Sequence, residues 1–194
     1  MKTENNVMYI LRLTVTLLLI CAVVAAALAG VNAITKDKIA AIQAEKTQKA
    51  IEAVLPGAEK LEEIPFTDET GLVTKVYKSD MSLSSDSASA FGYAVEVRPA
   101  GFGGAITMMV GISDDGKVLG ISIISHAETP GLGAVSAANS DKGVSFREQF
   151  KGLVAGITIG DGQNQVDALS GATITSKAIV DGVNAALECI KNLG

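Results

Sequence analysis

Histidine, cysteine and tryptophan are almost missing from this sequence. Its 194 residues contain one histidine, His126, two cysteines, Cys21 and Cys189, and no tryptophan. The two cysteines form no Cys-x-x-Cys pair, which argues against a disulfide framework, an iron–sulfur cluster and a structural zinc site. A single histidine likewise argues against a histidine-rich metal site. We therefore expect no metal-binding site in this chain.

Positive charge is scarce in the larger part of the chain. Residues 57–194 contain ten Lys or Arg against seventeen Asp or Glu, whereas residues 1–56 contain six against four. The two parts therefore carry −7 and +2, which gives the formal net charge of −5. Proteins that bind nucleic acid need clustered Lys and Arg to contact phosphates. An acidic body without such a cluster predicts that nucleic acid is not a partner.

Charged side chains are also missing from Leu13–Val31, LTVTLLLICAVVAAALAGV. About 20 helical residues at ~1.5 Å each span the ~30 Å hydrocarbon core of a bilayer, so this run is long enough to cross a membrane. The alternative is a cleaved signal peptide, because Val31–Ala33 resembles a small-residue cleavage site and Lys2 and Arg12 precede the run. The run exceeds the ~7–15 apolar residues of a usual signal peptide, which favours a retained membrane helix.

The sequence divides into three segments. We expect an N-terminal stub and transmembrane helix at 1–33, an amphipathic juxtamembrane helix at 34–56 and a folded domain at 57–194. The apolar residues of the middle segment recur at helical spacing, at Ile39, Ile42, Ile51, Val54 and Leu55. Charges of both signs on its polar face favour packing on the protein over lying on the membrane. A short stub and a long C-terminal domain predict a single-pass protein of the cytoplasmic membrane with its domain on the extracytoplasmic side.

Two strands separated by a loop are predicted early in the domain. Thr74–Lys78 has the composition of a strand, and Tyr93–Val97 alternates between apolar and polar residues until Pro99. Between them, the sequence SDMSLSSDSAS at residues 79–89 contains six serines. Such a segment is typical of a surface loop.

A hairpin and a terminal helix complete the predicted fold. Two apolar runs, about Ala105–Ser113 and Lys117–Ser125, flank Asp115-Gly116. This dipeptide favours a tight turn with positive φ at its residues. From Ile179 to Ile190 the apolar residues follow the helical period. The predicted fold class is α+β, with a single N-terminal transmembrane helix followed by a mainly antiparallel sheet with packed helices.

The segment after the hairpin, SHAETPGLGAV at Ser125–Val135, is the first candidate site. Pro130 and the glycines that follow it predict a rigid turn that permits close backbone approach. His126 and Glu128 have the chemistry of a general acid–base pair, since histidine titrates near neutral pH. The alternative is a histidine that is simply hydrogen-bonded at the surface, because no nucleophile with a partner is evident nearby.

The second candidate site, DALSGATITSKA at Asp167–Ala178, gathers four hydroxyl side chains ahead of the terminal helix. The structural interpretation is a helix N-terminus capped by Thr175 or Ser176. That interpretation leaves Ser170 and Thr173 unexplained. Helix N-termini also attract anions through unpaired N–H groups and the helix dipole. The segment therefore also has the features of an anion site, above all for phosphate.

Both segments resemble motifs of FMN-binding domains. DALSGATIT is similar to the flavinylation motif Asp-x-x-(Ser/Thr)-Gly-Ala-Thr, and SHAETPGLG is similar to the second motif of that family, His-x-Glu-Thr-Pro-Gly-Leu-Gly. The two motifs lie about 40 residues apart, behind one predicted membrane helix. The whole chain thus resembles the G subunits of Rnf (Rsx) electron-transport complexes. The related C subunits of sodium-pumping NADH:quinone reductases share the motifs but are usually longer.

The resemblance implies covalent attachment of FMN. The phosphoester would be formed with the last threonine of the motif, Thr173 here, by a flavin transferase that uses FAD and releases AMP. Thr175, two positions later, is the competing attachment residue. The rest of the motif implies recognition and turn-forming roles for Asp167, Ser170, Gly171 and Ala172.

The second motif implies further contacts to the cofactor. The residues that match it are His126, Glu128, Thr129, Pro130, Gly131, Leu132 and Gly133. If this loop folds over the Thr173 loop, we expect Leu132 against the isoalloxazine ring and His126 or Glu128 near its polar edge.

The function implied by the resemblance is that of a membrane-anchored electron-transfer subunit. It would work in an Rnf-type complex that couples electron transfer between ferredoxin and NAD to movement of Na⁺ or H⁺. Its partners would be the other membrane and peripheral subunits, the membrane, and the flavin transferase during maturation. The alternatives are a C subunit of a quinone reductase, a flavin-free extracytoplasmic interaction module, and a hydrolase that uses His126 without any flavin.

Overall fold

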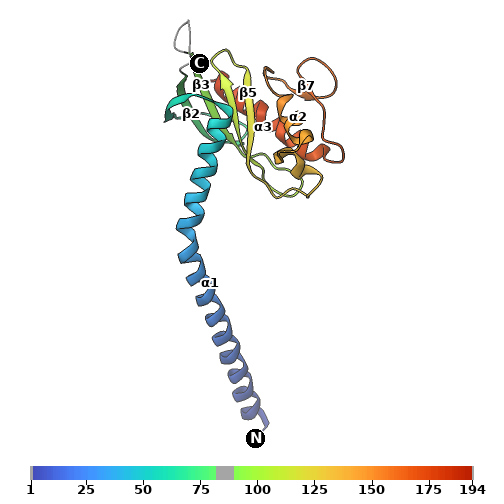
Figure 1. Ribbon diagram of the computed structural model, residues 1–194. Coiled ribbons are helices and arrows are strands. Elements are labelled where there is room, and N and C mark those ends of the chain that lie inside the picture. Colours follow the sequence, from blue (N-terminus) through green and yellow to red (C-terminus); the bar gives the residue numbers. More distant parts are fainter. Residues whose placement is uncertain (1, 82–89, 194) are drawn as a thin grey trace. The chain divides into compact units, whose positions relative to one another are not determined.

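The structure is a computed structural model that describes residues 2–81 and 90–193. Two compact units are found along the chain, one that ends at Glu45 and one that begins at Lys46. Figure 1 shows the order of the elements, from the blue helix at the N-terminus to the red helix near the C-terminus.

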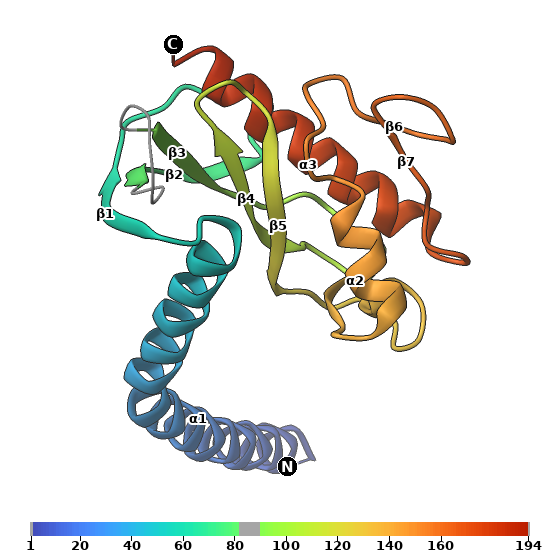
Figure 2. The same ribbon diagram turned by 45° about the horizontal axis from the view of Figure 1, so that its top comes forward.

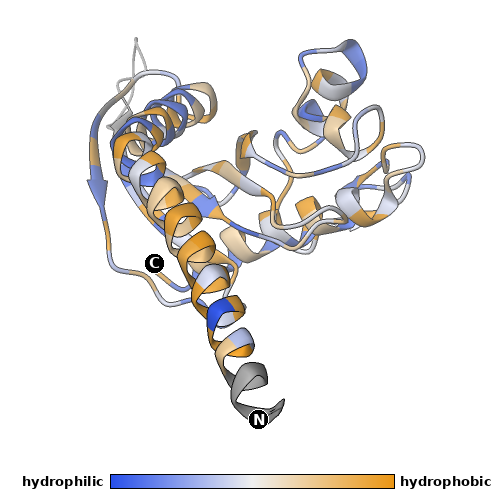
Figure 3. Ribbon diagram, turned by 90° about the horizontal axis from the view of Figure 1, so that it is seen from below, coloured by the Kyte–Doolittle hydropathy of each residue, from blue (hydrophilic) through white to orange (hydrophobic). Residues whose placement is uncertain are grey.

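A single helix, α1 (Lys2–Val54), contains the whole charge-free run. Its side chains from Met8 to Glu45 are exposed, and its apolar part is long enough to cross a membrane. The orange colour along much of this helix in Figure 3 marks the same apolar residues. The predicted transmembrane and juxtamembrane segments are thus parts of one uninterrupted helix.

The last turns of α1 pack on the sheet of the second unit. Ile51, Val54 and Leu55 are buried there, together with Ala94 and Met109 of the sheet. Nearer the N-terminus of the helix, Ile39 and Ile42 of the predicted apolar face are exposed. Packing of the amphipathic helix on the protein is therefore confined to its final turns.

The second unit contains a five-stranded antiparallel sheet, as the predicted α+β fold requires. Its strands follow chain order as β1 (Ala58–Glu63), β2 (Val73–Met81), β3 (Ala90–Val97), β4 (Thr107–Ser113) and β5 (Val118–Ser125). The predicted strands correspond to β2, β3, β4 and β5. Strand β1 was not predicted, because its sequence AEKLEE is charged at four of its six positions. Charged residues of this kind are common on edge strands, where they oppose pairing with other chains.

Two loop predictions need correction. Residues 79–81 of the serine-rich segment belong to β2, while residues 82–89 lie outside the described residues. The hairpin turn also differs from the prediction, which gives positive φ to both Asp115 and Gly116. Ser113 N donates to Lys117 O and Gly116 N donates to Ser113 O, so the loop has three residues, and Gly116 but not Asp115 has positive φ. A type I turn followed by a left-handed glycine gives this geometry.

The sheet is covered on both faces. Figure 2 shows α3 (Thr173–Lys191) lying across one face, and the last turns of α1 cover the other. Side chains of β3 alternate between the two, with Val95 and Val97 in the cluster that contains α3 and Ala94 in the cluster that contains α1. The terminal helix is thus confirmed, although it begins six residues before Ile179.

The chain between β5 and α3 carries the two candidate loops. It contains the 3₁₀-helix η1 (Gly133–Ala137), α2 (Asp141–Glu148) and a short parallel pair, β6 (Thr158–Ile159) and β7 (Gln165–Val166). Ser136 Oγ donates to Gly133 O at 2.7 Å. Arg147 Nη1 donates to the carbonyls of Ser136 and Ala138 at 2.6 and 3.0 Å, and burial lowers the pKa of this arginine. These bonds fix η1 directly after the first candidate loop.

Candidate functional site

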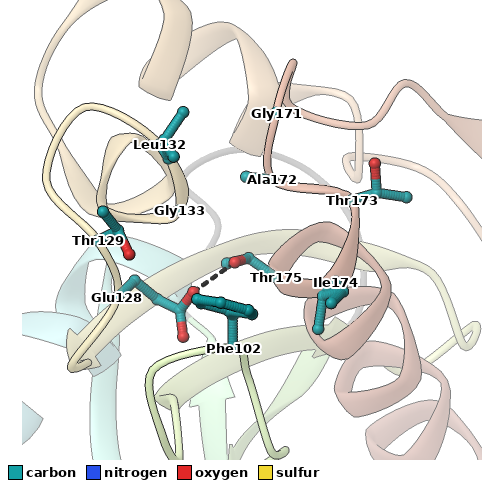
Figure 4. Close-up of a pocket in the computed structure, with 10 residues that line it drawn as sticks. All are labelled: Phe102, Glu128, Thr129, Leu132, Gly133, Gly171, Ala172, Thr173, Ile174 and Thr175. Carbon is teal, nitrogen blue, oxygen red and sulfur yellow. Dashed lines mark hydrogen bonds between the residues drawn. The ribbon is translucent and has the colours of Figure 1, made fainter.

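The two candidate loops meet at one pocket of about 400 Å³. Its walls come from the loop between β3 and β4, the loop after β5 and the start of α3 (Figure 4). The lining residues are Phe102, Glu128, Thr129, Leu132, Gly133, Gly171, Ala172, Thr173, Ile174 and Thr175. Segments distant in the sequence therefore form one concave site.

A buried carboxylate joins the three walls. Glu128 is 5% exposed, its Oε1 accepts from Gly103 N at 2.9 Å, and its Oε2 accepts from the hydroxyl of Thr175. Figure 4 shows the bond to Thr175 beside the ring of Phe102. Buried carboxylates require such partners, because an unpaired one is costly to desolvate. Glu128 thus fixes the relative positions of the three segments.

The loop after β5 contains the rigid turn that the sequence predicts. Leu132 N donates to Thr129 O at 3.2 Å, and Gly131 has φ of +77°. Proline at the second position and a left-handed glycine at the third are characteristic of a type II turn. Gly133 has a different role, since a Cβ atom there would lie 2.5 Å from both Glu128 Oε2 and Thr175 Oγ1. Gly131 allows the turn, whereas Gly133 allows the close packing behind it.

The close packing at Gly133 gives a stability prediction. We expect Gly133→Ala to lower the free energy of unfolding by about 1–3 kcal/mol, because the added methyl group must displace two buried, bonded oxygens. Gly120→Ala is the matched control, since a Cβ atom there meets Lys151 Cε at an ordinary 3.9 Å. Replacing this strand glycine is expected to be neutral or stabilising by up to ~1 kcal/mol. Urea unfolding of both variants measures the difference, and equal effects would contradict the assigned role of Gly133.

The start of α3 differs from the predicted cap. The helix begins at Thr173 with Ala172 at the N-cap position, where no side chain accepts from the first turn. Ser176 instead accepts from Leu169 N at 2.9 Å and donates to Ala172 O at 3.0 Å. Thr175 donates to Glu128. The prediction of Thr175 or Ser176 as the cap is therefore wrong, because both hydroxyls hold other segments.

The two threonines predicted as alternative attachment residues have opposite environments. Thr175 is 1% exposed and is bonded to Glu128. Thr173 is exposed, and its hydroxyl has no hydrogen-bond partner among the residues that the structure describes. Figure 4 shows its side chain on the other side of the helix start, pointing away from Thr175 and Glu128. Thr173 therefore has the accessible hydroxyl of the pair.

The remaining residues of the flavinylation motif divide between two surfaces. Gly171, with φ of +72°, forms a turn closed by a bond from Ala172 N to Leu169 O at 2.9 Å. A Cβ atom on Gly171 would lie 3.1 Å from Leu132 Cδ2, so the two candidate loops meet here. Asp167 and Ser170 line a separate groove that also contains Lys142 and Gln149.

Three residues of the second motif do not line the pocket. His126, Pro130 and Gly131 are outside its lining, although they belong to the loop that carries Glu128 and Leu132. His126 Nδ1 accepts from the backbone N–H of Glu128 at 3.2 Å. The side chain of Glu128 bonds to Gly103 and Thr175. The side chains of His126 and Glu128 are therefore not bonded to each other.

Two apolar residues of the pocket, Phe102 and Ile174, were not predicted from the sequence. They are 68% and 58% exposed. The signal for Phe102 was its place in AGFGG, an aromatic residue between glycines that follows a strand. Ile174 lies between two polar threonines at the start of the helix, and it is not part of the helical apolar pattern that runs from Ile179 to Ile190.

The residues present fit an FMN group. The volume lies in the ~300–1,000 Å³ range of small-molecule sites, and such sites combine apolar walls with a few polar groups. Phe102, Leu132 and Ile174 supply apolar surface for a ring. The backbone N–H groups of Thr173, Ile174 and Thr175 at the start of α3 have no acceptor among the described residues, as a phosphate site at a helix start requires.

Comparison with known proteins agrees with this fit. The chain matches the model of the FMN-binding domain family over residues 101–188 and that of the RnfG N-terminal region over residues 1–54. It is 34% identical to the G subunit of the Na⁺-translocating ferredoxin:NAD⁺ oxidoreductase complex of Acetobacterium woodii, over 99% of this chain and 97% of that one. Its identity to the G subunit of the proton-translocating ferredoxin:NAD⁺ oxidoreductase complex of Clostridium ljungdahlii is also 34%, over 96% of this chain and 93% of that one.

A solved structure is also similar in part. The crystal structure of the C subunit of Na⁺-translocating NADH-quinone reductase from Parabacteroides distasonis matches with a TM-score of 0.48 and 24% identity, over 61% of this chain and 62% of that chain.

The fold, the pocket and the matched motifs define an FMN-binding domain. Because the identity extends over nearly the whole length of both chains, the protein belongs to the family of G subunits of Rnf-type ion-translocating oxidoreductase complexes.

Proposed function

We propose that this protein carries FMN covalently on Thr173 and transfers electrons through it within an Rnf-type complex. The observation that carries the proposal is the exposed hydroxyl of Thr173, without a partner among the described residues, at the rim of the pocket and at the start of α3. Thr175 is the weaker candidate, because a transferase would have to expose it and break its bond to Glu128.

The start of α3 suits a phosphoester on Thr173. The first N–H groups of a helix lack internal acceptors, and together with the helix dipole they favour negative charge, by about 0.3–1 kcal/mol per charge at an exposed site. No acidic residue lies in the first turn of α3 to compete with a phosphate. Attachment there adds the favoured charge at the rim and leaves the pocket itself for the ring.

A tether of this kind suits an electron carrier. When bound, the isoalloxazine ring supplies the redox chemistry, which attachment through phosphate leaves unchanged. The chain supplies the attachment point on Thr173 and the apolar walls formed by Leu132 and Ile174. It also supplies a rigid loop framework through Glu128. A carrier held in this way stays beside its donor and acceptor.

Attachment requires a flavin transferase as a maturation partner. In the proposed reaction the Thr173 oxygen attacks the FMN phosphorus of FAD. The phosphoanhydride bond breaks, AMP leaves with the bridging oxygen, and the hydroxyl proton is released. Asp167 and Ser170 line a groove on the same loop but outside the flavin pocket. That location supports a role of Asp167 and Ser170 in recognition by the transferase. It does not support contact of these residues with the attached ring.

The proposed recognition role predicts that Asp167→Asn slows attachment without altering the product. Loss of a hydrogen bond to a charged group costs about 1.5–3 kcal/mol, so we expect the rate of flavin attachment to fall about tenfold or more. Asp161→Asn, an exposed change outside both pockets, is the matched control. Timed reactions with purified transferase and FAD give the rates. An unchanged rate for Asp167→Asn would exclude this role.

We further propose the membrane arrangement and the partners. The apolar part of α1 anchors the protein as a single-pass helix, the stub lies in the cytoplasm, and the domain, residues 57–194, lies on the extracytoplasmic side. Residues 1–33 and 34–56 would act as anchor and connection. The other members of the complex are the proposed electron donor and acceptor. The names of the two relatives support ferredoxin and NAD⁺ as the substrates of the complex, with Na⁺ or H⁺ as the translocated ion.

Reversible reduction of the attached flavin tests the electron-transfer role. Protein made beside the transferase is expected to lose its visible flavin absorption on reduction with dithionite and to recover it on oxidation, with the flavin still attached after denaturation. Membrane vesicles that contain the complex with Thr173→Ala are expected to lose ferredoxin:NAD⁺ electron transfer. Full activity of those vesicles would contradict a role of this flavin in the relay.

A further inference from the structure

We propose that Phe102 forms the aromatic wall of the flavin pocket and shields the ring from water, and that Glu128 is the positioning residue that holds Phe102 there. This inference rests on the proposed function and adds a residue that neither motif contains. It concerns how the chain tunes its cofactor, and not whether the cofactor is attached.

Phe102 is a large apolar residue that is exposed at the pocket. The residue is 68% exposed, although burial of a phenylalanine side chain is favourable. It lies at a pocket whose other apolar walls, Leu132 and Ile174, are also exposed. Three exposed apolar side chains from three chain segments therefore surround one cavity. Such a cluster indicates a ligand with a large apolar surface.

The loop that presents Phe102 is closed by its own backbone. Gly101 N donates to Gly104 O at 2.8 Å, Ile106 N donates to Pro99 O at 2.9 Å, and Ala100 and Ala105 form a β-bridge. A loop with this many internal bonds holds its tip in one place. Phe102 is thus presented by a rigid element.

Glu128 fixes this loop against the second motif. Its Oε1 accepts from Gly103 N, the backbone group next to Phe102. A Cβ atom on Gly103 would lie 2.7 Å from the carbonyl carbon of Ala127 and 3.2 Å from Glu128 Cα, so the two backbones are in direct contact. The other oxygen of Glu128 is bonded to Thr175. Glu128 therefore acts on the pocket through Phe102 and Thr175, and its carboxylate is committed to these bonds.

The physical consequence is restricted access of water to the ring. A small-molecule site buries ~70–90% of its ligand, so loss of one wall roughly doubles the exposed fraction. A drier, less polar site disfavours the negative charge that a flavin gains on reduction. Removal of the Phe102 ring is therefore expected to raise the reduction potential of the flavin.

The test uses the full-length, flavinylated protein with Phe102→Ala, Phe102→Leu and Glu128→Gln. Intact mass first establishes that each preparation carries FMN. We then expect iodide, a soluble quencher of flavin fluorescence, to quench Phe102→Ala with a constant about twice that of wild type, since one wall of the site is lost. The quenching constant of Phe102→Leu should lie between those of wild type and Phe102→Ala, because leucine keeps apolar surface.

Glu128→Gln should change the quenching constant and the reduction potential of the flavin in the same direction as Phe102→Ala. Val154→Ala, another exposed apolar residue but outside the pocket, should match wild type in both.

The outcomes separate this inference from the proposed function. If wild type and Phe102→Ala both carry FMN but have the same quenching constant and potential, Phe102 is not a wall of the flavin site, and the proposed function stands. If Phe102→Ala changes both values and Glu128→Gln changes neither, the positioning role of Glu128 is wrong. A wild-type protein without FMN in the presence of the transferase overturns both proposals.

Discussion

Thr173→Ala is expected to abolish covalent flavin completely. Attachment requires an oxygen nucleophile, and this substitution removes the exposed hydroxyl at the rim of the pocket while leaving the buried contacts unchanged. Alanine also favours the helical backbone of the first turn of α3, so we expect no loss of stability. Protein made beside the transferase, denatured and separated on a gel, should show flavin fluorescence for wild type and none for Thr173→Ala.

Two matched variants make this result specific. Thr173→Ser keeps a hydroxyl at the same position and should retain flavin. Thr175→Ser keeps the hydroxyl that bonds to Glu128 and should also retain it. Thr175→Ala is a poorer control, because it leaves a buried carboxylate oxygen without its donor at a cost of about 1–3 kcal/mol. Flavin that persists in Thr173→Ala and disappears in a folded Thr175→Ala protein would move the attachment to Thr175.

Charge placed in the apolar run of α1 is expected to release the protein from the membrane. The double variant Leu18→Arg with Val23→Arg puts two charges near the middle of the run Leu13–Val31. Each charge costs about 2.5–3.5 kcal/mol at the centre of a membrane helix, so the pair removes roughly 5–7 kcal/mol of insertion free energy. Wild type should sediment with membranes and require detergent for release, whereas the variant should be soluble or degraded.

The same helix supplies the control for this experiment. Ile39→Arg with Ile42→Arg adds the same two charges to exposed positions of α1 beyond the charge-free run. This variant should remain in the membrane fraction. Release of both variants, or of neither, would contradict insertion through Leu13–Val31. A wild-type mass that lacks the first 33 residues would instead indicate a cleaved signal peptide.

The parts of the fold that can be predicted from the sequence are those that depend on local sequence patterns. The apolar run, the hairpin and the terminal helix follow from periodicity and turn chemistry, which act between near neighbours. β1 does not, because its charged sequence becomes a strand only by pairing with β2 at the edge of the sheet. The predicted cap of α3 was wrong for a similar reason. The hydroxyls of Thr175 and Ser176 bond to Glu128 and Leu169, which lie elsewhere in the chain.

The candidate site was predictable as far as its motifs extend. The motifs located Thr173 and Leu132, and the structure brings their loops together at Gly171. Phe102 was not found, because its role depends on a pocket that forms only when three distant segments meet. The four hydroxyls that no single helix cap explains have separate surroundings. Ser170 lines a groove, Thr173 has no partner among the described residues, Thr175 holds Glu128, and Ser176 holds the preceding turn.

The most direct test of the central claim is the intact mass of the full chain, made with and without the flavin transferase. With the transferase we expect a gain of roughly 0.44 kDa, the mass of one FMN joined as a phosphoester, and fragment spectra that locate it on Thr173. Without the transferase the mass should be that of the unmodified chain. An unmodified mass in the presence of an active transferase and FAD, or a flavin mapped to another residue, would contradict the account.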